Sequence, residues 1–60
     1  MDEYLSTKQI AQILGVRTIT VRRWIQKGTL PAIALGEINK EYRISKKEFE
    51  QFLAERRVTK

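Results

Sequence analysis

The sequence predicts a mostly α-helical fold made of three short helices and one small β-hairpin. Two amphipathic helical patterns lie on either side of Gly15, two strand-like runs flank a loop near residues 36 to 40, and a third helical pattern follows Ser45. The chain has 60 residues, which predicts a single domain over 1–60. A domain of this size buries only about 60% of the surface that its unfolded chain exposes. Its stability must therefore come from close packing of a few large apolar side chains.

The first helix is expected to begin after Ser6, because Ser6 and Gln9 have the spacing of a capping box. Leu5 and Ile10 occupy the two apolar positions that usually accompany such a cap. Gly15 is expected to end the helix, since it adopts the left-handed backbone conformation of a helix end at little cost. The apolar residues at helical spacing, which predict the inward side, are Ile10, Ile13 and Leu14.

The second helix is expected to cover about Thr18 to Lys27. Gly28 then stops it and Pro31 prevents its continuation. Its inward side is predicted to carry Val21, Trp24 and Ile25, at positions i, i+3 and i+4. The opposite side carries Ile19, Arg22, Arg23 and Gln26.

Two short runs, 32–35 and 41–44, are expected to pair as a β-hairpin around the loop 36–40. Strand alternation places Arg43 on the face opposite to Tyr42 and Ile44, which are assigned to the core. If small residues lie beneath it, Ala32 and Ala34 share the face of Arg43 and leave its side chain room to extend.

The last helix begins with a second predicted capping box, formed by Ser45 and Glu48, and Ile44 and Phe49 are its apolar pair. The order helix, turn, helix, hairpin, helix is that of a winged helix-turn-helix, mostly α with a small β-hairpin wing. The residues expected in the core are Leu5, Ile10, Ile13, Leu14, Val16, Val21, Trp24, Ile25, Leu30, Ile33, Leu35, Ile44, Phe49, Phe52 and Leu53.

The charge balance favours an anionic partner. The net charge is +5, from 12 Lys and Arg against 7 Asp and Glu, which suits nucleic acid or a membrane surface, although solubility alone would also explain it. No apolar run approaches the roughly 18 residues of a membrane span, and the acidic start does not resemble a secretion signal. We therefore expect a cytoplasmic protein with no membrane partner.

Catalysis finds little support in the composition. The chain has neither His nor Cys, so zinc clusters and thiolate chemistry are excluded, and Ser6 and Ser45 are assigned to helix caps. Glu37 and Glu41 lie in or beside a loop without a supporting site. We expect a non-enzymatic protein with no catalytic residues, no bound metal and no cofactor.

Several short segments at fixed spacing carry a resemblance to a known family. They are Tyr4-Leu5-Ser6-Thr7, Ile10-Ala11, Leu14-Gly15-Val16, Thr20-Val21-Arg22-Arg23-Trp24-Ile25, Gly28-x-Leu30-Pro31-Ala32, Tyr42-Arg43-Ile44 and Phe52-Leu53. Together they resemble the excisionase-like branch of the MerR-type DNA-binding domains, over nearly the whole chain. The combination of VRRWI, GxLPA and YRI is specific, whereas each piece alone is weak.

The resemblance implies that the second helix enters the DNA major groove and that the wing follows the backbone or the adjacent minor groove. It also implies DNA contacts, most simply to phosphates, for Arg22 and Arg43. The chain departs from the family at Arg17, where relatives usually have Ser, Thr or Asp. It also departs in a longer wing loop and at Ala34, where Lys or Arg is frequent.

The outward residues of the second helix and the wing are the candidate DNA contacts. Ile19 would meet a thymine methyl group, and the arginines would meet phosphates or guanine O6 and N7. The alternatives are solvated charges for the arginines, a minor core contact for Ile19, and a purely turn-forming role for the wing loop. The complete set is Arg17, Thr18, Ile19, Thr20, Arg22, Arg23, Gln26, Lys27, Asn39, Lys40 and Arg43.

The expected function is sequence-specific binding of double-stranded DNA, and three roles remain open. The first is an excisionase of a phage or integrative element that binds repeated sites, bends DNA and redirects an integrase. The second is a small transcriptional regulator, and the third is the DNA-binding domain of a larger recombinase, terminase or regulator. Because no heptad repeat follows the last helix, we expect a monomer in solution that binds DNA cooperatively, head to tail.

Overall fold

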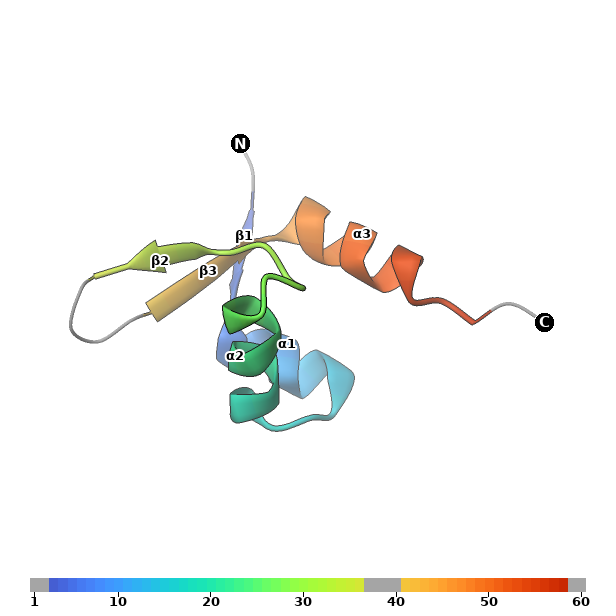
Figure 1. Ribbon diagram of the computed structural model, residues 1–60, viewed down its shortest axis with the longest axis horizontal. Coiled ribbons are helices and arrows are strands. Elements are labelled where there is room, and N and C mark those ends of the chain that lie inside the picture. Colours follow the sequence, from blue (N-terminus) through green and yellow to red (C-terminus); the bar gives the residue numbers. More distant parts are fainter. Residues whose placement is uncertain (1–2, 37–40, 59–60) are drawn as a thin grey trace.

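The computed structural model describes residues 3–36 and 41–58 and has a winged helix-turn-helix fold (Figure 1). It contains three helices and a small antiparallel sheet with strand order β1-β3-β2. The elements are β1 (Tyr4–Ser6), α1 (Thr7–Leu14), α2 (Thr18–Gln26), β2 (Ile33–Leu35), β3 (Glu41–Ser45) and α3 (Lys46–Glu55). The molecule is elongated, 44 × 28 × 20 Å, because α3 extends in the opposite direction to β2 and β3, which are the strands of the wing (Figure 1).

The predicted ends of α1 are confirmed. The Ser6 hydroxyl accepts a hydrogen bond from the Gln9 backbone N–H at 3.1 Å, and the Ser6 N–H donates to Gln9 Oε1 at 2.9 Å. This reciprocal pair satisfies two backbone donors that the start of a helix would otherwise leave unpaired. Gly15 closes the helix with φ 68°, and its N–H donates to the Ala11 carbonyl.

Helix α2 begins as predicted at Thr18 and ends at Gln26, one residue before the expected Lys27. Arg17 is its N-cap residue, and its side chain makes no capping hydrogen bond. Gly28 follows with φ 79°, a conformation that residues with a Cβ resist, so the chain turns there toward Pro31. At the start of α3, the Ser45 hydroxyl accepts from the Glu48 N–H at 3.4 Å, which is one of the two hydrogen bonds of the predicted capping box.

The third strand of the sheet was not predicted. Residues Tyr4–Ser6 form β1, and Leu5 pairs opposite Ile44. The Glu3 carbonyl also accepts from the Lys46 N–H at 2.9 Å, which ties the first described residue to the start of α3. This pairing joins segments about 40 residues apart. The two strands are not connected by a hairpin turn, which is the local signal by which a sequence reveals strand pairing.

The register of the wing corrects one expectation. Ala34 lies opposite Tyr42, and Ile33 lies opposite Arg43. Directly opposed residues share a face of a sheet, so Arg43 shares its face with Ile33 and not with Ala34. Ile33 and Leu35 are accordingly exposed, and their assignment to the core was wrong.

The core lies between the helices and the inner face of the sheet. Its buried residues are Ile10, Ala11, Val21, Leu30, Ile44, Phe49 and Phe52. Ile13 is 59% exposed, so its assignment to the core was also wrong. At about 100° per residue, the buried arc of α1 is centred between Ile10 and Ala11, which leaves Ile13 beyond its edge. The buried residues of α1 are Thr7, Ile10 and Ala11.

Trp24 packs in the core as predicted, although it is only half-buried. Its ring lies 5.3 Å from that of Phe52 at a tilt of 42°. The Arg56 guanidinium lies 3.9 Å from the centre of the Phe52 ring, and Arg56 Nη1 donates to the Phe52 carbonyl at 3.3 Å. Phe52 therefore joins α2 to α3, and Arg56 caps the C-terminal end of α3. In the part of the chain that the structure describes, no helix is long and apolar enough to cross a membrane.

Candidate nucleic-acid interface

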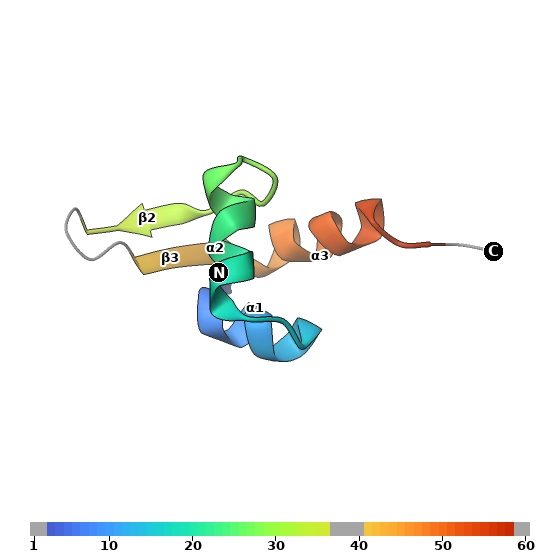
Figure 2. The same ribbon diagram turned by 60° about the horizontal axis from the view of Figure 1, so that its bottom comes forward.

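The outer side of α2 is the best-formed candidate surface. Figure 2 shows α2 at the front of the molecule, crossing α1, with the wing to one side. The exposed residues of this helix include Ile19, Arg22, Arg23 and Gln26, at positions i, i+3, i+4 and i+7. They form one continuous stripe, as predicted, while Val21 on the other side is completely buried. A large apolar side chain that is 47% exposed, Ile19, therefore lies in line with two arginines.

The residues around the ends of α2 differ in access. Arg17 and Lys27 are exposed, whereas Thr18 and Thr20 are half-buried. The Arg17 carbonyl accepts from the Thr20 N–H at 3.0 Å, so the helix is formed from its first turn. Because Arg17 caps α2 without a side-chain hydrogen bond, its guanidinium is not used to hold the helix end.

Arg43 of the wing lies on the exposed face that alternation predicted, but its side chain is engaged. Its Nη2 lies 3.3 Å from Glu41 Oε2, and its Nη1 donates to the Tyr42 carbonyl at 3.1 Å. Its side chain therefore lies back along its own strand and does not extend freely. The other two wing candidates, Asn39 and Lys40, lie outside the described residues.

A groove of about 310 Å³ joins the wing to α2 and to the start of α1. We call it the wing groove, and it is lined by Ser6, Thr7, Lys8, Arg22, Glu41, Tyr42 and Arg43. Two of the predicted DNA contacts, Arg22 and Arg43, thus line the same groove. The first backbone N–H groups of a helix lack intrahelical partners and carry partial positive charge, so the start of α1 adds to the local positive potential.

The sequence-based prediction missed Lys8 and the start of α1 as parts of this surface. The capping box predicted that a helix starts after Ser6. It did not predict that this helix starts beside strand β3. Pairing of β1 with β3 places Ser6 opposite Arg43, and this long-range pairing forms the wing groove. No pattern within the first ten residues indicates it.

Residues 4–57 match the family model of the helix-turn-helix domain. The protein belongs to the helix-turn-helix domain family. Comparison with curated proteins found no match, and comparison with solved structures found none. Helix-turn-helix domains as a class bind DNA through their second helix, and α2 is the second helix of this chain.

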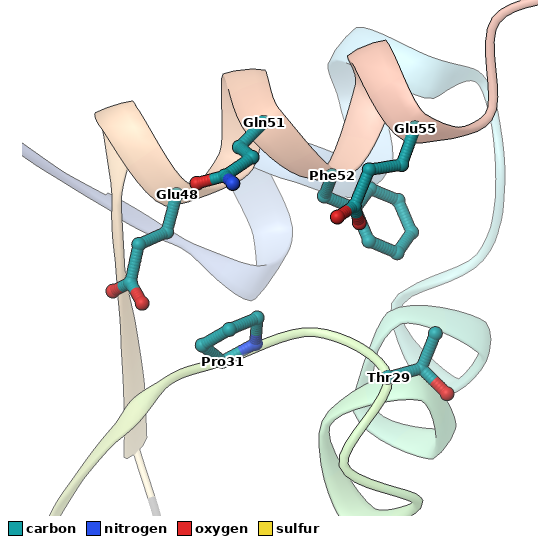
Figure 3. Close-up of a pocket in the computed structure, with 6 residues that line it drawn as sticks. All are labelled: Thr29, Pro31, Glu48, Gln51, Phe52 and Glu55. Carbon is teal, nitrogen blue, oxygen red and sulfur yellow. The ribbon is translucent and has the colours of Figure 1, made fainter.

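Charge on this helix-turn-helix domain is unevenly distributed. A second groove, of about 200 Å³, lies between α3 and the segment after α2. In Figure 3, Glu48, Gln51 and Glu55 extend from α3 toward Pro31 and Thr29. Two carboxylates in so small a groove repel phosphates, so this side of the domain is unsuited to DNA. The cationic stripe of α2 and the wing groove are the surfaces suited to a phosphate backbone.

Proposed function

We propose that this domain binds double-stranded DNA sequence-specifically, with α2 in the major groove and the wing along the adjacent backbone. The observation that carries the proposal is the exposed stripe of Ile19, Arg22, Arg23 and Gln26 on α2. At about 1.5 Å per residue, a nine-residue helix is about 13 Å long. That length fits the major groove and spans about four base pairs.

The assignment of contacts follows from position along α2. In helix-turn-helix domains the N-terminal part of the second helix reaches base edges, which suits Arg17, Thr18, Ile19 and Thr20. Ile19 offers a branched apolar surface to a thymine methyl group, and Arg22 and Arg23 offer donors to phosphates or to guanine O6 and N7. Gln26 and Lys27, in the last turn and just beyond it, fit backbone contacts.

The wing supplies the second set of proposed contacts. Arg43 contacts a phosphate beside the wing groove, and Asn39 and Lys40 reach the backbone or the minor groove. Minor-groove recognition mostly separates A·T from G·C pairs and depends on groove width. These contacts therefore position the domain more than they specify a sequence.

Among cellular roles, we propose an excisionase that binds repeated sites, bends DNA and redirects an integrase. The support is the resemblance of the VRRWI, GxLPA and YRI segments to excisionase-like domains, which the helix-turn-helix family includes. The proposal includes a single domain over 1–60 that is monomeric in solution and binds DNA cooperatively. A small transcriptional regulator, or the DNA-reading part of a larger recombinase, terminase or regulator, would use the same surface.

Selection from a pool of random duplexes tests the DNA-binding proposal directly. Wild-type protein is expected to enrich one short motif, and Arg22→Ala is expected to enrich that motif more weakly. Arg57→Ala is the matched control, because Arg57 is also exposed but follows α3, away from the proposed surface. Equally weakened enrichment in both variants, or unchanged enrichment in both, contradicts the assignment of α2.

The proposed role is tested on the selected site. Tandem copies of the site, labelled at both ends, are expected to bend on binding and to raise energy transfer between the labels. An integrase gene beside the coding gene would identify the recombination reaction to reconstitute. Binding to isolated sites without bending, and without any effect on excision by that integrase, contradicts the excisionase role but leaves DNA binding intact.

A further inference from the structure

Strand β3 extends beyond β1 at the wing groove. β1 pairs with residues 43 to 45 and β2 with residues 41 to 43. On the side of β1, Glu41 and Tyr42 therefore have no strand opposite them. Arg43 Nη1 donates to the Tyr42 carbonyl at 3.1 Å, so the side chain of Arg43 lies beside this part of β3.

Arg43 also forms an ion pair with Glu41. The distance from Nη2 to Glu41 Oε2 is 3.3 Å, and the two side chains are 38% and 66% exposed. Among the described residues that line the wing groove, Glu41 is the one carboxylate. The others include three cations, Lys8, Arg22 and Arg43. A carboxylate thus lies in a groove whose other described charges are positive.

We propose that Glu41 is an intramolecular competitor of DNA phosphate for the Arg43 guanidinium. In the free protein the carboxylate holds Arg43 against its own strand. On binding, a phosphate replaces the carboxylate, and Arg43 turns from Glu41 to the DNA. This inference rests on the proposed DNA-binding function, and it makes Glu41 a positioning residue that sets how readily the wing engages the backbone.

The chemistry of the guanidinium supports an exchange of partners. Arginine binds carboxylates and phosphates with the same planar fork of N–H donors, so one anion substitutes for the other. In the free protein Nη1 is committed to a carbonyl and Nη2 to a carboxylate. A bidentate contact with phosphate requires release from at least one of them. Because the pair with Glu41 is exposed to solvent, its release costs little, and the exchange adjusts affinity without blocking binding.

Glu41 also acts on DNA directly as a like charge. Removing the charge of Glu41 frees Arg43 and also removes the repulsion between Glu41 and the DNA phosphates. Of these two effects, only the first depends on Arg43. We expect Glu41→Gln to bind a duplex about 3- to 10-fold more tightly at about 50 mM salt. The gain should shrink at about 200 mM salt, where exposed charges are screened.

The experiment measures anisotropy of a fluorescein-labelled mixed-sequence duplex of about two helical turns, titrated with the full chain. Glu41→Gln is compared with Glu50→Gln, which changes the net charge by the same amount at an exposed position of α3. Glu50→Gln is expected to change affinity by less than about 2-fold, since it alters only the overall charge. In an Arg43→Ala background, most of the gain from Glu41→Gln is expected to disappear.

Side-chain NMR gives a readout that does not depend on affinity. In the free wild type, the Arg43 guanidinium should rotate slowly because two of its nitrogens are held. In Glu41→Gln its rotation should become faster, with unchanged backbone shifts outside the wing. Unchanged rotation of Arg43 in Glu41→Gln would show that the ion pair does not hold the side chain in solution, and this would overturn the proposal.

The remaining outcomes separate this inference from the proposed function. If wild type binds the duplex and Glu41→Gln binds equally well, the competition is absent while DNA binding stands. An equal gain in Glu50→Gln, or a gain that persists fully without Arg43, assigns the effect to general repulsion and also overturns the proposal. If neither wild type nor Glu41→Gln binds with a salt-dependent affinity, the proposed function itself fails.

Discussion

Arg22 belongs both to the exposed stripe of α2 and to the wing groove. Its side chain is exposed, so its removal leaves the core intact. Arg22→Ala is expected to weaken DNA binding by about 1–3 kcal/mol, about 5- to 150-fold, at an unchanged Tm. Anisotropy titration and thermal unfolding followed by circular dichroism measure the two quantities. A lowered Tm, or unchanged binding, would remove Arg22 from the DNA-contact set, with Arg57→Ala as the reference for a lost surface charge.

Trp24 is on the opposite side of the same helix and is expected to behave in the opposite way. Its ring packs on Phe52 and so joins α2 to α3. Trp24→Ala should cost about 3–5 kcal/mol of folding stability, a large share of the total for so small a domain. Urea unfolding provides the measurement, and Trp24→Phe should retain most of the stability. A folded Trp24→Ala variant that loses only DNA affinity would show that the inner side of α2 is wrongly assigned.

Elements whose signals are local could be predicted from the sequence. The hydroxyl of Ser6 and the left-handed Gly15 mark the ends of α1, and Gly28 marks the turn after α2. Helical spacing also identified the buried Val21 and the exposed Arg22. Such features depend on neighbours within about four residues, which a sequence pattern contains.

Features that depend on distant pairing could not be predicted. Leu5 was assigned to the core, but its pairing opposite Ile44 in a third strand has no local signature. Ile33 looks like a core residue by hydropathy, yet register places it on the outer face beside Arg43. Arg43 forms an ion pair with Glu41 because its side chain lies along the strand. Strand alternation alone does not determine this orientation of the side chain.

The wing as a unit is expected to contribute affinity rather than sequence preference. Arg43→Ala combined with Lys40→Ala should weaken binding to the selected site and to unrelated duplexes alike. The salt slope should fall by up to about two phosphate equivalents, each worth about 0.9 in the slope of log K against log salt. The base preference beneath α2 should remain. Wild-type affinity and slope in the double variant would mean that α2 binds without the wing.

For the molecule as a whole, the uneven charge predicts strong salt dependence. The described cations of the proposed surface are Lys8, Arg17, Arg22, Arg23, Lys27 and Arg43, whereas the groove beside α3 carries carboxylates. If four or five of these cations meet phosphates, the slope of log K against log salt is expected to be about −4. Titrations of one duplex at several salt concentrations give this slope. A flat response would remove DNA as the partner.

Ser45 is both the last residue of β3 and the N-cap of α3, so the strand continues into the helix without a loop. If the bound DNA bends and displaces the wing, we expect β3 to pass this displacement on to α3. We therefore expect the direction of α3 to change together with the direction of the wing. A spin label near the C-terminal end of α3, far from the proposed contact surface, should then report how strongly the DNA is curved.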